Sequence, residues 1–208
     1  MADTEPLLRA QWAALRAWLA DEDVLARADD ASGLGDWTVA DLVVHLGYGL
    51  RMLAEVGAAV DEEPVALGRY VAGYVPARDR IADDTRAAAS GLRGAELTGI
   101  DAMAAEAWAA LDVGLPPVVL GRRGPLRADD FLLTRLLELV THGDDLHRLL
   151  GPGHRSPLLP AAVDRVADAL AAAYAEVAGR APGWAGLDLI RVATGRTATD
   201  DPALPLLS

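Results

Sequence analysis

Four polar residues recur on one face of the segment 128–150. They are Arg135, Glu138, His142 and Asp145. Their offsets of 0, 3, 7 and 10 place them within an arc of roughly 80° on an α-helix. Glu138 and His142 are one turn apart, so both side chains can bind the same metal ion. The alternative is a solvated stripe of ion pairs within one helix, because Glu-x-x-x-His is a common spacing.

A second candidate ligand, His45, stands in the apolar run Leu42–Leu46, with Asp41 one turn upstream. The run predicts that His45 is buried. It is then either a metal ligand that faces another helix or a core histidine bonded to a carbonyl. Gly47 and Gly49 follow directly, and glycine costs about 1 kcal/mol relative to alanine in a helix. This pair indicates either room for a ligand or close helix packing.

Helices must position these residues, because apolar side chains recur at spacings of three and four along most of the chain. The predicted helices are Thr4–Ala28, Val39–Val60, Tyr70–Ser90, Glu96–Leu111, Ala128–Leu150 and Pro160–Gly179. Thr38 and Asp41 have the spacing of a capping box at the second helix. Pro76 is expected in the first turn of the third helix or at a kink in it.

Two short segments differ from this helical pattern. Val118–Arg127 has apolar runs around Gly121 and Gly124 and predicts a hairpin. Leu187–Ala193 is a strand candidate near the C-terminus. The expected protein is mainly α, with a helical bundle over residues 1–150 and a small helix-plus-strand appendage over 151–208.

The composition excludes several classes of function. The net charge is −12, so a nucleic acid or an anionic membrane is not an expected partner. There is no cysteine, which excludes disulfides, zinc–thiolate sites and a thiol nucleophile from the chain itself. All 19 cations are arginine, which excludes Schiff-base chemistry. Residues 1–6 do not resemble a signal peptide and no apolar run approaches a membrane span, so we expect a cytoplasmic protein.

Two motifs together resemble a known superfamily. They are Trp37–Leu46 (WTVADLVVHL) and Thr134–Leu146 (TRLLELVTHGDDL). Their order and separation are similar to those of the DinB-like metalloenzymes. Within these, the chain most resembles the mycothiol-dependent maleylpyruvate isomerase family of actinobacteria. The likeness covers about residues 5–150.

The resemblance implies a four-helix bundle that holds a divalent metal through His45, Glu138 and His142. Zinc is the expected metal, and nickel is the alternative. Three protein ligands leave a fourth position open, as in catalytic zinc sites. Asp145 matches an acid of the family that fixes a ligand histidine or acts on substrate protons; otherwise it is a surface acid. Arg135 matches an arginine that pairs with the glutamate or holds a substrate carboxylate.

The same resemblance implies that mycothiol or a similar small thiol supplies the sulfur. A metal-bound thiolate could add to a double bond and leave again, which gives isomerisation, or stay attached, which gives S-transfer. Both reactions need cations for carboxylates. Arg191 and Arg196, in Ile190–Arg196, are candidates for binding the thiol and for catalysis respectively; otherwise they are surface arginines in a turn.

Other interpretations stay open. The family's isomerase has a fuller C-terminal domain, whereas about 57 residues follow Gly151 here, so the substrate is left unassigned beyond a small electrophile. The bundle could also bind metal without catalysis, as a sensor or interaction module. A metal-free interaction domain is the third interpretation, and homodimerisation is open in all three.

Overall fold

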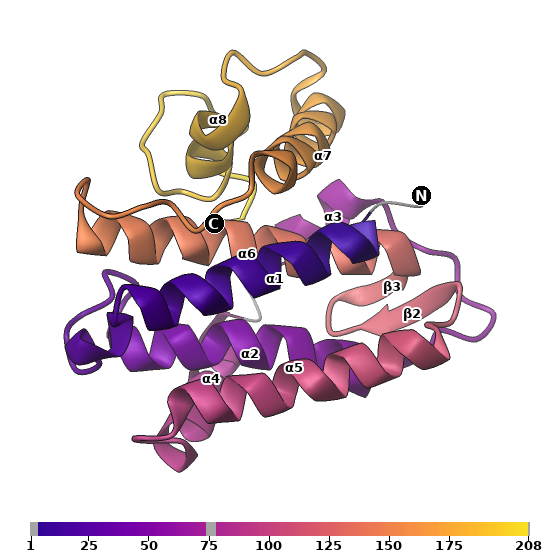
Figure 1. The fold of residues 1–208 in the computed structure, drawn as a ribbon. Helices are drawn as coiled ribbons and strands as arrows, with labels where there is room; N and C mark the ends of the chain where they lie inside the picture. The colour runs from indigo at the N-terminus through magenta and orange to yellow at the C-terminus, as the bar shows by residue number, and fades with distance from the viewer. Residues whose placement is uncertain (1–3, 74–77, 208) are drawn as a thin grey trace.

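A computed structural model describes residues 4–73 and 78–207 and is mainly helical, with a small sheet at one end (Figure 1). The helices are α1 (Thr4–Asp21), the 3-10 helix η1 (Val24–Arg27), α2 (Val39–Glu55), α3 (Leu67–Ala72), α4 (Arg78–Gly91), α5 (Glu96–Val113), α6 (Ala128–Leu150), α7 (Pro160–Ala178) and α8 (Gly186–Ala193). The strands are β1 (Gly57–Ala58), β2 (Val118–Gly121) and β3 (Gly124–Arg127). In these described parts, no helix is both long and apolar enough to cross a membrane.

The helices α1, α2, α5 and α6 lie side by side (Figure 1). Helix α2 packs against α5 and α6, and α1 packs against α6. Helix α4 covers another side of α2. Buried leucines and aromatic side chains from α1, α2, α5 and α6 form the main apolar core, and Val44, Tyr48, Ala89 and Met103 form a smaller cluster where α4 meets α2 and α5. The helices α2 and α6, which carry the candidate ligands, are therefore fixed against each other by packing.

The start of α2 confirms the predicted capping box. The backbone N–H of Asp41 donates to Oγ1 of Thr38 at 3.1 Å, and the backbone N–H of Thr38 donates to Oδ2 of Asp41 at 2.8 Å. The helix ends at Glu55, before the predicted end at Val60. The chain becomes extended at Val56 and then adds β1 to the edge of the hairpin, a long-range pairing that local periodicity does not reveal.

The predicted hairpin is confirmed as β2 and β3, which pair antiparallel from Val118↔Arg127 to Gly121↔Gly124. Gly124 has a φ of 120°, a conformation that other residues rarely adopt. Arg122 and Arg123 form the tip of this hairpin.

The single helix predicted over Tyr70–Ser90 is wrong. Helix α3 begins earlier, at Leu67, and ends at Ala72, and α4 begins at Arg78. The break follows α3 at Gly73, and glycine is a poor helix former. The predicted role of Pro76 lies outside the described residues.

The predicted strand at Leu187–Ala193 is also wrong, because this segment is helix α8. Its buried side chains, Leu189, Ile190, Val192 and Ala193, follow helical spacing. An apolar run this short fits a strand and a helix equally well, and packing against α7 decides between them. The appendage is thus helical, and Leu170, Tyr174 and Leu189 join the main core. The division into two domains at residue 150 stays a prediction.

Candidate metal centre

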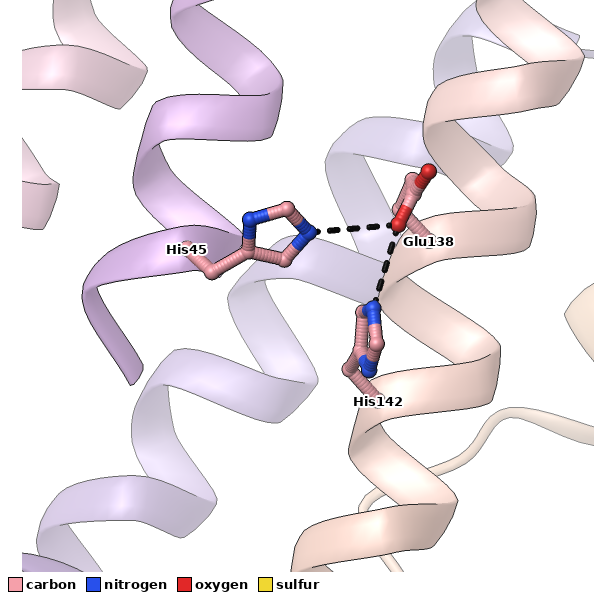
Figure 2. Close-up of side chains that lie close together, drawn as sticks. All are labelled: His45, Glu138 and His142. Carbon is pink, nitrogen blue, oxygen red and sulfur yellow. Dashed lines mark hydrogen bonds and ion pairs between the residues drawn. The ribbon is translucent and has the colours of Figure 1, made fainter. Parts of the chain in front are cut away.

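Three side chains from α2 and α6 converge on one point (Figure 2). Nε2 of His45 lies 3.4 Å from Oε2 of Glu138, and Nε2 of His142 lies 3.2 Å from the same oxygen. One ligand atom from each residue lies within 4.8 Å of the other two. The two imidazole rings meet edge to face, with centroids 5.0 Å apart. The sequence-predicted ligands are therefore brought together in space.

The second nitrogen of each imidazole has its own partner. Nδ1 of His142 lies 2.9 Å from Oδ2 of Asp145, and Nδ1 of His45 lies 3.1 Å from Oγ1 of Thr85. When a metal is bound, we expect each ring to keep its proton on Nδ1, which donates to these oxygens, and to bind the metal through Nε2. In the metal-free protein, an Nε2 that carries a proton donates to Glu138 instead.

This donor set fits zinc. A tetrahedral zinc ion with bonds of about 2.0–2.2 Å sets its ligand atoms about 3.4 Å apart. The distances of 3.4 and 3.2 Å from the Glu138 oxygen to the two imidazoles match that spacing, and the ligand atoms of the two histidines lie within 4.8 Å of each other. Two imidazoles and one carboxylate are also ligand types that zinc binds, and nickel accepts imidazole as well.

The electrostatics of the cluster follow from burial and from these contacts. Burial alone would raise the pKa of the Glu138 carboxyl, but hydrogen bonds from His142 and His45 hold that pKa well below its usual range. Desolvation lowers the pKa of His45. Desolvation also acts to lower the pKa of His142, but hydrogen bonds to Asp145 and Glu138 raise it above its ordinary value. The carboxylate is thus ionised and ready to bind a cation.

A cavity of about 150 Å³ opens beside two of the three candidate ligands, His45 and Glu138. His142 is not among the residues that line it. A small molecule bound in this cavity would lie next to these two residues. Apolar side chains form part of the wall, including Met52, Val56 and Phe131.

Three arginines line the same cavity, namely Arg135 from α6 and Arg122 and Arg123 from the hairpin tip. Arg122 donates to Oδ2 of Asp84 at 2.9 Å and to the hydroxyl of Tyr48 at 2.6 Å. The guanidinium of Arg123 lies 4.3 Å from the centroid of the Tyr70 ring. The sequence pattern predicts the hairpin but contains no signal that places its arginines at a cavity.

Two other residues of the site were missed. Thr85 is fully buried on α4, and no motif connects it with His45. The Trp37 ring packs on His45 with centroids 4.8 Å apart. Trp37 directly precedes the N-cap residue Thr38, and an apolar residue at that position packs back onto the first turns of the helix. This position could have predicted a contact between Trp37 and α2.

The predicted arginines of the C-terminal segment lie away from this cavity. Arg196 donates from Nε and Nη2 to the two carboxylate oxygens of Asp145, at 3.2 and 2.8 Å. Arg191 donates from Nε and Nη2 to the two oxygens of Asp144, at 2.8 and 2.7 Å. Arg196 thus reaches the candidate metal centre through Asp145 and His142. Arg191 is held in a separate ion pair, and its predicted role in binding the thiol stays a prediction.

The two glycines of α2 have different roles. A Cβ at Gly47 would lie 2.7 Å from Cβ of Ile100, so this glycine allows α5 to pack closely. A Cβ at Gly49 would meet only Nη1 of Arg135, at 3.8 Å, and Gly49 lines the cavity. Close helix packing is therefore the role of Gly47, and room beside the candidate site is the role of Gly49.

The fold and the site define a mainly helical protein with a candidate three-residue metal centre beside a cationic cavity. The chain matches the family model of the mycothiol maleylpyruvate isomerase N-terminal domain over residues 8–147, and it belongs to that family. This confirms the predicted resemblance. A search of curated proteins and a search of solved structures each found no significant match.

Proposed function

We propose that this protein is a metal-dependent enzyme that uses a small thiol, such as mycothiol, for isomerisation or S-transfer on a small electrophile. The observation that carries the proposal is the convergence of His45, Glu138 and His142 at one edge of a cavity. The family's description names both mycothiol and an isomerase, which supports the class of reaction. A DinB-like four-helix bundle accounts for the side-by-side packing of the long helices.

Each residue has a distinct part in this proposal. His45, Glu138 and His142 hold a divalent metal, with zinc first and nickel second. The bound metal supplies the charge that favours the thiolate form of an added thiol. Asp145 orients His142, and Arg196 orients Asp145. The chain has no cysteine, so the thiol must come from a second molecule.

The test combines metal content with turnover. We expect about one zinc or nickel ion per chain in protein purified without added metal or chelator, measured by mass spectrometry. We expect His45→Gln to lose both the metal and thiol-dependent turnover of an electrophile panel that includes maleylpyruvate. His147→Gln is the matched control, because His147 lies on α6 but bonds to the carbonyl of His154 instead.

Two outcomes would contradict the proposal. A metal content near zero after incubation with zinc and desalting would remove the metal centre. Bound metal without turnover for any thiol and electrophile would favour the non-catalytic interpretation, a metal-binding sensor or interaction module.

A further inference from the structure

Helix α4 reaches the candidate metal centre through one buried hydroxyl. Thr85 is fully buried, and its Oγ1 lies 3.1 Å from Nδ1 of His45. Among the residues that the structure describes, no other polar group lies within hydrogen-bond distance of this nitrogen. His45 is itself 7% exposed, so little of its ring is left for solvent. Nδ1 of His45 therefore depends on α4 for its hydrogen bond.

Apolar packing holds α4 on the bundle only weakly. The helix packs mainly on α2 (Figure 1). Over its residues 80–91, only Thr85 and Ala89 are buried. Segments with few buried apolar contacts open at a low free energy. The contact between Thr85 and His45 thus contributes a large share of what holds α4 in place.

Helix α4 also forms part of the cavity wall. Ile81 lines the cavity. Asp84 accepts from Arg122, at the hairpin tip, at 2.9 Å and from the hydroxyl of Tyr48 at 3.2 Å. A change in the docking of α4 would therefore move one wall of the cavity and release a contact of the hairpin tip.

The contact of Thr85 should be stronger when a metal is bound. A hydroxyl can accept from Nδ1 or donate to it, so in the metal-free protein the direction of this hydrogen bond is not fixed. Binding of a metal at Nε2 leaves the ring proton on Nδ1, and the hydroxyl must then accept. The metal charge polarises this N–H, and hydrogen bonds that involve a charged group are about twice as strong as neutral ones.

We propose that Thr85 is a positioning residue for His45, and that metal binding tightens the docking of α4 on α2 through this contact. The inference rests on the metal site of the proposed function and not on its reaction. A coupling free energy acts in both directions. Loss of the Thr85 hydroxyl should therefore weaken metal binding and also make α4 insensitive to the metal.

Amide hydrogen exchange on the full chain, with and without zinc, tests the coupling. We expect zinc to slow exchange in residues 80–91 by at least about fivefold. Helix α7, which carries none of the candidate ligands or cavity residues, is the internal reference and should respond less. Exchange in α4 that does not change when zinc is bound would overturn this inference alone. A chain that binds no zinc would refute the proposed function together with it.

Variants then assign the coupling to the hydroxyl. Thr85→Val keeps the size of the side chain, and we expect it to raise the Kd for zinc by about tenfold or more. At saturating zinc, exchange in its residues 80–91 should no longer respond to the metal. Thr85→Ser keeps the hydroxyl and should restore both properties. Thr141→Val is the matched control, because Thr141 is buried on α6 and its hydroxyl has no hydrogen-bond partner in the described parts of the chain.

The zinc affinities of these variants decide between a positioning role and a structural one. An unchanged Kd in Thr85→Val would show that the contact does not position His45. Equal losses in Thr85→Val and Thr85→Ser would assign the effect to packing of the methyl group and overturn the role of the hydroxyl. If Thr85→Val does not fold, the effect of zinc on α4 in the unaltered protein still decides whether the two are coupled.

Discussion

Nδ1 of His142 lies 2.9 Å from Oδ2 of Asp145, and the same carboxylate accepts two hydrogen bonds from Arg196. This chain of contacts runs from the C-terminal segment to a candidate metal ligand. Because Asp145 fixes the proton of His142 on Nδ1, the other ring nitrogen is directed toward Glu138. The segment after α8 thus helps to order a site built on α2 and α6.

The first prediction concerns metal affinity. Asp145→Asn should weaken zinc binding by about 10–100-fold, because the amide is a weaker acceptor for the Nδ1 proton and holds the ring less firmly. A competition titration against a chromophoric chelator measures this change. Glu106→Gln, at an exposed position of α5, is the control and should bind zinc as the unaltered protein does. Unchanged affinity in Asp145→Asn would show that this contact does not support a metal ligand.

The second prediction concerns acid stability of the metal-free protein. Burial alone would raise the pKa of Asp145, but hydrogen bonds from His142 and Arg196 lower it to about 2. An unfolded chain has an aspartate pKa of about 3.9, so the folded protein holds this proton less tightly. The resulting stabilisation is fully present above about pH 4 and is lost as the pH falls toward about 2. At about 1.4 kcal/mol per pKa unit, it amounts to between about 2 and 3 kcal/mol.

Urea unfolding between pH 3 and pH 6, with a chelator present, measures this effect. The free energy of unfolding of the unaltered protein should exceed that of Asp145→Asn by an amount that shrinks toward acid pH. A difference that stays constant over the whole range would show that the Asp145 carboxyl titrates alike in the folded and unfolded chains.

Local rules in the sequence were sufficient for α6 and for part of the site. Its predicted bounds, Ala128 and Leu150, agree with the structure, because acids begin it and a glycine follows it. The turn from Glu138 to His142 follows from helix geometry alone. Only the family resemblance predicted that His45 lies next to Glu138 and His142. The positions of these residues in the sequence do not show that they are close in space.

The rest of the site depends on packing between distant segments. Thr85 reaches His45 because α4 packs on α2, and Arg122 reaches the cavity because β1 fixes the hairpin beside the end of α2. Neither contact has a local pattern. The wrong prediction of a strand at Leu187–Ala193 has a similar cause. The segment is helical because it packs against α7, and no local pattern reveals that contact.

The third prediction compares the two glycines of α2. Gly47→Ala should lower the free energy of unfolding by about 1–3 kcal/mol, because its Cβ would lie within 2.9 Å of Cα of Ile100, and that backbone cannot move without shifting α5. Gly49→Ala is the matched control on the same helix. Its Cβ would meet only Nη1 of Arg135 at 3.8 Å, so alanine should be tolerated or stabilising by up to about 1 kcal/mol. Thermal or urea unfolding measures both, and equal effects would contradict the close packing at Gly47.

The fourth prediction separates a structural role of Arg191 from a role in thiol binding. Asp144 is 2% exposed, and Arg191 holds both of its carboxylate oxygens. Arg191→Gln should leave that carboxylate buried without its cation and lower the free energy of unfolding by about 2 kcal/mol. This is less than the roughly 3–5 kcal/mol for a fully buried pair, because part of Arg191 reaches solvent.

A second change at Asp144 tests this explanation. The double variant Asp144→Asn with Arg191→Gln removes both charges and should recover part of the lost stability, with metal content unchanged. Urea unfolding and metal analysis of the three variants measure these effects. If Arg191→Gln is as stable as the unaltered protein but raises the KM for the thiol, Arg191 binds the thiol and its pairing with Asp144 does not stabilise the fold.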